Sequence, residues 1–354
     1  MMISLSANGR KHEGEMRRLQ VTGGSTYIVS LPKKWITKNQ LRKGSSLLLL
    51  EEDDGSLSVS SPSELARKET SDEALIKVSS NDNPNTIVRK AVSAYLVGYN
   101  MIHIRARDHQ QMISRQRNTA KDFARRLLVG TEIVTDTPTE LILQVLLSYP
   151  ELSIQSALRR MCIITSSMHK DAMTALKDHD SQLAKSVVAT DDEVDRFNLY
   201  VIRQLKMAIQ NPRIIKEIGL KNARDCLGYR LVTKSVERTA DHAASIAENV
   251  LLLKKPIDVE IFKNLEEMST LAISMFETAI EALFRLDFNL AESVIQKTKD
   301  VNFTMKEALL SSKRIGSEEI ANLRLVIESL RRTAEYASDI AEIVLNLTVE
   351  SIIG

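Results

Sequence analysis

The chain has 354 residues, enough for two or three domains with a core in each. Hydrophobic residues make up 43% and aromatic residues only 4%, a balance that favours packed helices over β-sandwich cores. No apolar run approaches the roughly 18 residues of a membrane span, and the two cysteines form no CxxC motif, so a membrane-spanning protein and a disulfide framework are both disfavoured. We expect a cytoplasmic protein without membrane insertion.

The N-terminal part predicts short strands and turns. Residues 1–15 are expected to form a disordered lead, and residues 16–62 a small β-rich domain. In chain order we expect a strand at Leu19–Val21, a turn at Thr22–Ser25, a strand at Tyr27–Leu31, one or two helical turns at Lys33–Gln40, and strands at Leu47–Leu50 and Leu57–Val59. So few strands leave open edges, which predicts pairing with a second copy in a homodimer.

The same region is basic. Between Arg10 and Lys43 there are nine Lys or Arg and only two Glu, whereas acidic residues slightly outnumber basic ones from Glu151 onward. Contacts with phosphate groups need such cations. We therefore predict that this domain binds DNA through seven cations: Arg17, Arg18, Lys33, Lys34, Lys38, Arg42 and Lys43. We expect Trp35, Ile36 and Leu41 to be buried beneath the cations of the short helix and its turn. The alternatives are a solvated basic surface and a domain that only joins two chains.

Residues 63–150 alternate between strand and helix patterns and predict a small α/β domain. Strands are expected at Ala74–Ser79, Met101–Arg105, Thr131–Val134 and Glu140–Leu147, with helices at Pro84–Tyr99 and Asp108–Leu128. Asn83 and Pro84 are typical of a helix start. The sequence contains neither GxGxxG nor GxxxxGK, so it gives no support for a nucleotide site.

From Glu151 onward the pattern is helical. One apolar seam has alternating spacings of three and four, as in packed helices: Leu158, Met161, Thr165, Met168, Ala172 and Ala175. An internal repeat follows. Residues 175–188 align without gaps with residues 282–295 at seven identical positions of fourteen, and residues 229–250 align with 323–344 at twelve of twenty-two. The repeat predicts two three-helix bundles, copy one at 151–255 and copy two at 256–354.

Acidic residues recur at a spacing of four in copy one. Asp191 and Asp195 share one helix face, as do Glu237 and Asp241, so four carboxylates converge if the two helices pack together. Clustered carboxylate oxygens suit hard cations, which relieve their mutual repulsion. The alternative interpretation is a solvated acidic face, or one paired with Arg196 and Arg238.

The duplicated part, about residues 151–350, resembles the PhoU family of phosphate-uptake regulators. The matching motifs are the acidic element Asp191–Asp195, the run Glu237–Asp241 and the following Ile246–Glu248. The resemblance implies tandem three-helix bundles that bind metal through Asp191, Asp195, Glu237 and Asp241. It implies one cluster of divalent or ferric ions in copy one.

Copy two departs from that pattern. Its residues at the four equivalent positions are Thr298, Asn302, Arg331 and Glu335. Three of four carboxylates are replaced, one of them by an arginine, which cannot ligate a metal. We expect copy two to bind no metal and Arg331 to pair with Glu335 or another nearby acid.

Residues 22–62 resemble an AbrB/SpoVT-type DNA-binding domain. The resemblance rests on Ile28–Trp35, Leu41–Ser45 and Asp54–Leu57. Thr26-Tyr27 and Ser45 stand where that family usually has an arginine and an aspartate, so the fold is better supported than DNA affinity. The combination of all parts resembles archaeal PhoU-domain regulators.

The sequence favours a non-catalytic protein, since it has no Glu-x-x-His pair and no cysteine paired with a histidine. The leading hypothesis is a DNA-binding regulator of phosphate uptake and homeostasis, with the bundles as sensor or relay. The runner-up is a scaffold that does not bind DNA but docks on a phosphate ABC transporter or its partners. Metal storage is a third, weaker hypothesis.

Overall fold

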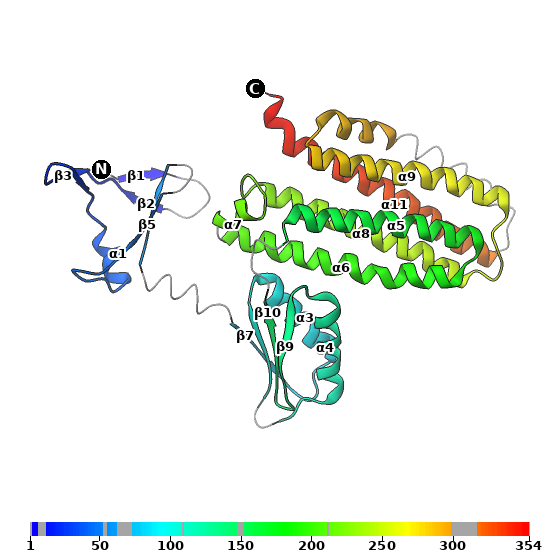
Figure 1. Cartoon of the computed structure of the whole chain (residues 1–354), viewed down its shortest axis with the longest axis horizontal. Helices are drawn as coiled ribbons and strands as arrows, with labels where there is room; N and C mark the ends of the chain where they lie inside the picture. Colours follow the sequence, from blue (N-terminus) through cyan, green and yellow to red (C-terminus); the bar gives the residue numbers. More distant parts are fainter. Residues whose placement is uncertain are drawn as a thin grey trace. The chain divides into compact units, whose positions relative to one another are not determined.

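A computed structural model describes residues 2–5, 12–51, 55–61, 73–107, 110–146, 152–210, 212–298 and 317–353. The chain divides into two compact units, Met1–Asp72 and Glu73–Gly354 (Figure 1). The second unit contains both the α/β domain and the bundles. The domain boundaries expected near residues 62 and 150 fall outside the described residues, and the boundary near 255 lies in the loop between two long helices.

The first unit consists of small hairpins around one short helix. Its elements are β1 (Met2–Leu5), β2 (His12–Glu15), β3 (Gln20–Thr22), β4 (Thr26–Ile28), α1 (Lys33–Lys38), β5 (Leu48–Glu51) and β6 (Leu57–Ser60). Three separate antiparallel pairs form, β1 with β2, β3 with β4 and β5 with β6. The disordered lead expected over residues 1–15 is therefore wrong, because β1 and β2 pair.

The α/β domain is built on a four-stranded sheet in the order β7-β8-β10-β9. Its elements are β7 (Glu73–Val78), α3 (Pro84–Val97), β8 (Met101–Ala106), α4 (Ser114–Leu127), β9 (Thr131–Asp136) and β10 (Glu140–Val145). As predicted, Asn83 caps α3, accepting a 2.9 Å hydrogen bond from the backbone N–H of Asn85. Both helices cover the same side of the sheet (Figure 1). A core of apolar residues, among them Tyr95, Ile102 and Leu141, lies between the layers.

Long helices make up the rest of the second unit. They are α5 (Ile154–Asp178), α6 (Ser181–Gln210), the short α7 (Pro212–Glu217), α8 (Asp225–Leu252), α9 (Val259–Arg285), a helical stretch at 288–298, α11 (Ser317–Thr348) and the 3-10 turn η2 (Val349–Ser351). All six residues of the predicted apolar seam of α5 are buried. The mainly helical fold with tandem bundles is thus confirmed. No described helix has the length and apolar character needed to cross a bilayer.

The third helices of the two copies, α8 and α11, pack antiparallel against each other. His242 Nδ1 lies 3.2 Å from Ser329 Oγ, and the His242 ring stacks on Tyr336 with centroids 5.8 Å apart. Gly228 permits this approach, because a Cβ there would lie 3.2 Å from side-chain carbons of Ile343 and Leu347. Both copies therefore share one continuous core.

Helix α6 also joins the bundle to the α/β domain. Arg203 is only 3% exposed. Its guanidinium donates hydrogen bonds to the carbonyl oxygens of Tyr95, Gly98 (3.1 Å) and Tyr99 (3.0 Å) and to Oδ1 of Asn100 (2.6 Å). These acceptors lie where α3 ends, and the negative end of a helix favours a cation. The contact fixes the α/β domain to copy one.

Candidate cation and nucleic-acid sites

The four predicted acids of copy one lie on two neighbouring helices. Asp191 and Asp195 belong to α6, and Glu237 and Asp241 belong to α8. Asp191 interacts electrostatically with Asp241, Asp195 and Glu237, and Asp195 interacts with Glu237 and Asp241. The predicted convergence is therefore present. Glu237 is the most enclosed of the four, with 8% of its surface exposed.

This convergence disfavours ionisation of the three aspartates. Burial, and then the charges of Asp241 and Asp195, raise the pKa of Asp191 to about 7. Burial, followed by the charges of Glu237 and Asp241, raises the pKa of Asp195 to about 6. The pKa of Asp241 is raised by the same two causes, burial and Glu237, against the opposing effect of Lys234. Copy one thus holds more negative charge than its surroundings neutralise.

The contacts of Glu237 and Asp191 bear on whether the acidic cluster can hold a metal ion. Among the described residues, no three His, Cys, Asp or Glu side chains are placed to hold a metal ion. Lys234, one turn before Glu237 on α8, donates hydrogen bonds to both of its carboxylate oxygens. By contrast, Asp191 Oδ1 is buried and accepts no hydrogen bond within the described part of the chain. The cluster has one unsatisfied oxygen suited to a cation, but Glu237 is engaged by an ammonium group.

Copy two replaces the cluster with paired charges. Arg331 donates a 2.9 Å hydrogen bond from Nε to Glu328 and another bond from a terminal nitrogen to Glu335. Arg332 also bonds both acids, at 3.1 and 3.0 Å. Hydrogen bonds from Arg331 lower the pKa of Glu328. The predicted pairing of Arg331 is present; Thr298 contacts Ser338 Oγ at 3.4 Å, and Asn302 lies outside the described residues.

The seven cations predicted to bind DNA are all exposed. Lys33, Lys34 and Lys38 lie on α1, and Arg42 and Lys43 on the turn after it. Arg17 pairs with Glu15, while Arg18 lies before β3.

The apolar side of α1 differs from expectation. Trp35, Ile36 and Leu41 were expected to be buried, and the structure leaves all three half-buried. The hairpins around them form separate two-stranded sheets whose apolar residues are also exposed, such as Val21 at 59% and Leu49 at 59%. In the described part of this unit, these apolar side chains remain exposed and do not enclose the helix.

Several partners of these sites were not anticipated from the sequence. Lys234 and Glu328 each lie three residues before the charge they neutralise, a spacing that places two side chains on one helix face. That spacing could have identified both. Arg126 of α4 forms a 3.2 Å ion pair with Asp192 of α6, next to the acidic cluster. No local spacing indicates that contact, since it joins two domains.

Comparison with known proteins agrees with this architecture. Two stretches of the chain, residues 158–250 and 265–344, match the family model of the PhoU domain. A third stretch, residues 20–64, matches the family model described as antidote-toxin recognition MazE, bacterial antitoxin. The chain is 26% identical over 201 residues to a phosphate-specific transport system accessory protein PhoU homolog of Pseudomonas aeruginosa, covering 55% of this chain and 81% of that protein. It is 24% identical over 200 residues to PhoU homolog 1 of Thermotoga maritima, covering 54% and 84%.

A solved structure shows the same fold. The crystal structure of PhoU from Pseudomonas aeruginosa superimposes with a TM-score of 0.50 at 23% identity, over 56% of this chain and 96% of that one. The chain is therefore a helical-bundle protein with an additional N-terminal domain. The chain carries two PhoU domains and, before them, a MazE/AbrB-like domain, as the sequence motifs predicted.

Proposed function

We propose that this protein is a cytoplasmic regulator of phosphate uptake that binds DNA through its N-terminal domain. The observation that supports the proposal most is the union of two PhoU domains with a MazE/AbrB-like domain whose cations are all exposed. Exposed Lys and Arg side chains can neutralise phosphates and release counterions. The bundles would report the state of phosphate transport, and the N-terminal domain would act on a promoter.

A homodimer is part of this proposal. Leu49, Leu57 and Tyr27 expose 59%, 60% and 67% of their surface on the hairpins of the N-terminal unit. Exposed apolar residues on short open-edged hairpins are the usual mark of an interface. A second copy would cover them and would place two sets of cations on one DNA duplex.

Cation binding by the acidic cluster is the third part. The raised pKa values of Asp191 and Asp195 and the unsatisfied Oδ1 of Asp191 support it. Glu237 would have to leave Lys234 before it could join such a site. Carboxylates of this kind fit hard divalent or ferric ions, which would supply the missing positive charge.

The second candidate is a scaffold that contacts a phosphate ABC transporter without binding DNA. The similarity to proteins named as accessory to a phosphate-specific transport system favours it, because the PhoU-domain matches lie outside the N-terminal domain that would bind DNA.

A mobility-shift titration over salt separates the two candidates. We expect Lys34→Ala to weaken DNA binding to a similar degree on all sequences and to reduce the log–log salt slope by about one unit, as the loss of one phosphate contact requires. Arg160→Ala is the matched control, because Arg160 is an equally exposed cation on α5. Loss of binding to one operator alone would indicate base readout by Lys34, and no binding of the unmodified protein even at low salt would favour the scaffold.

A further inference from the structure

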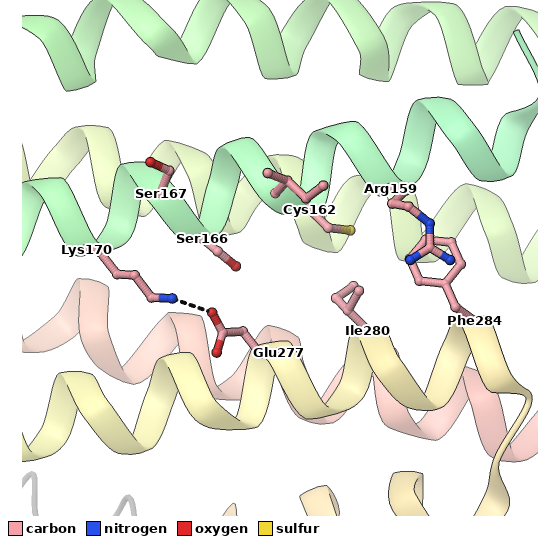
Figure 2. A pocket seen from close by; sticks show the side chains of 9 residues that line it. Arg159, Cys162, Ser166, Ser167, Lys170, Glu277, Ile280 and Phe284 are labelled. Atoms are coloured by element: carbon pink, nitrogen blue, oxygen red, sulfur yellow. Dashed lines mark hydrogen bonds and ion pairs between the residues drawn. The ribbon is translucent and has the colours of Figure 1, made fainter.

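A groove runs between α5 of copy one and α9 of copy two. It contains one hollow of about 470 Å³ and a second of about 350 Å³, and Lys170 borders both. Lys170 reaches across the larger hollow to Glu277 at 2.7 Å (Figure 2). From Arg159 to Lys177 the groove follows α5 for about 27 Å at 1.5 Å per residue. These helices differ from the pair that carries the acidic cluster.

The two walls of the groove carry opposite charges. The α5 wall presents Arg159, Lys170 and Lys177, and the α9 wall presents Glu266 and Glu277. All five side chains are exposed. Charge complementarity therefore favours an occupant with acidic groups on the side that faces α5 and basic groups on the side that faces α9.

Apolar side chains contribute to the base of both hollows, beside Ser166 in the larger one and Ser269 in the smaller one. Figure 2 shows Cys162, Ile280 and Phe284 between the walls of the larger hollow. Ile163 borders the same hollow and is 64% exposed, which is unusual for an isoleucine within a packed bundle. The guanidinium carbon Cζ of Arg159 lies over the Phe284 ring, 4.1 Å from the ring centroid. Apolar residues bordered by charges are typical of surfaces that bind amphipathic helices.

We propose that this groove is the docking site for an amphipathic helix of a partner protein. The apolar stripe of that helix fills the two hollows, its acidic flank faces α5, and its basic flank faces α9. A groove of this length accommodates a helix of about 18 residues. A small molecule fits less well, because the groove is long and continues on both sides of Lys170.

The ion pairs across the groove offer little resistance to such a helix. Lys170 and Glu277 have 59% and 46% of their side chains exposed, and Lys177 lies 3.9 Å from Glu266, at the limit of an ion pair. Exposed pairs of this kind contribute little to stability and are screened by salt. Each partner can therefore exchange its present contact for one with the incoming helix.

The test uses two synthetic 18-residue helical peptides and fluorescence anisotropy with the full chain. Both peptides share one apolar stripe; the first has one acidic and one basic flank, and the second has two basic flanks. We expect the unmodified protein to prefer the first peptide by at least about tenfold. The Lys170→Glu/Lys177→Glu variant, in which Arg159 is the remaining cation of the α5 wall and both walls carry acidic residues, should reverse that preference.

Two further variants make the result decisive. Ile163→Asp should weaken binding of both peptides, and Arg160→Glu, an exposed charge on α5 outside the groove, should leave the preference unchanged. Circular dichroism confirms that each variant is folded. The proposal is overturned if neither peptide binds, if the double variant keeps the original preference, or if Ile163→Asp has no effect.

Discussion

The two copies of the bundle share a helix pattern and differ in the charges on their third helices. In copy one, Lys234 precedes Glu237 by three residues and donates to it. At the equivalent positions of copy two, Glu328 precedes Arg331 by three residues and accepts from it. The same ion pair is thus present in both copies with its polarity reversed, on homologous helices.

The reversal has different consequences in the two bundles. In copy two, two arginines face two glutamates, and the pKa of Glu328 is lowered. In copy one, a single lysine pairs with Glu237 while three aspartates stand close by, two with pKa values raised to about 7 and about 6. Duplication has left one bundle with neutralised charges and the other with a surplus that a cation or protons can relieve.

The largest effect is expected from Arg331→Glu in copy two. The change places a third carboxylate between Glu328 and Glu335, where Arg331 now bonds both. We expect a loss of about 2 kcal/mol in the free energy of unfolding, because each glutamate keeps only Arg332 and gains a like charge in place of Arg331. Urea denaturation with and without Mn²⁺ measures it. Unchanged stability in the absence of metal would contradict the neutralising role of Arg331.

A smaller effect of opposite sign is expected from Asp191→Asn in copy one. The folded pKa of Asp191, about 7, lies above its ordinary value of 3.8, so the folded state binds this proton more tightly. The contribution to stability is complete at acidic pH and is lost as pH rises from about 4 to about 7. Asparagine avoids that loss, so the variant should be more stable than the unmodified protein by on the order of 1 kcal/mol at pH 8.

Thermal melts from pH 5 to pH 8 test this sign. The difference in melting temperature between the variant and the unmodified protein should grow with pH. Glu335→Gln in copy two is the matched control, and it should instead destabilise, because Glu335 is paired with both arginines. A variant at Asp191 that loses stability at pH 8 would show that its carboxylate is needed in ionised form.

The least effect is expected from cation binding itself. At a concentration of Mn²⁺ or Fe³⁺ three times its dissociation constant, binding would stabilise the chain by about 0.8 kcal/mol. The shift in melting temperature should disappear in Asp195→Asn/Glu237→Gln and persist in Glu335→Gln. An equal shift in all three proteins would place the cation elsewhere and would end the proposed asymmetry between the copies.

Much of the fold followed from the sequence because its signals are local or periodic. The α5 seam, the Asn83 cap and the repeat all depend on spacings within one or two helices, and the structure has each. The convergence of the four carboxylates could also be predicted, since a spacing of four fixes the helix face. The Lys234 contact was missed although its spacing of three was visible.

What could not be predicted depends on how distant segments meet. Whether the four acids adopt a ligand geometry is decided by rotamers and by the competing ammonium of Lys234. Burial of Trp35 was expected from the apolar pattern around α1, but the pattern cannot tell whether one copy supplies enough cover. The α5–α9 groove arises only when both bundles pack together.

The buried contact of Arg203 has a consequence for the order in which the chain folds during synthesis. The described strands and helices of the α/β domain end at Val145. Yet the carbonyl oxygens at the end of α3 accept hydrogen bonds from Arg203, more than a hundred positions after Tyr95. Until α6 leaves the ribosome, those oxygens lack the buried Arg203 guanidinium as a donor. The α/β domain therefore reaches its final state only after the second helix of copy one, and not as an independent N-terminal step.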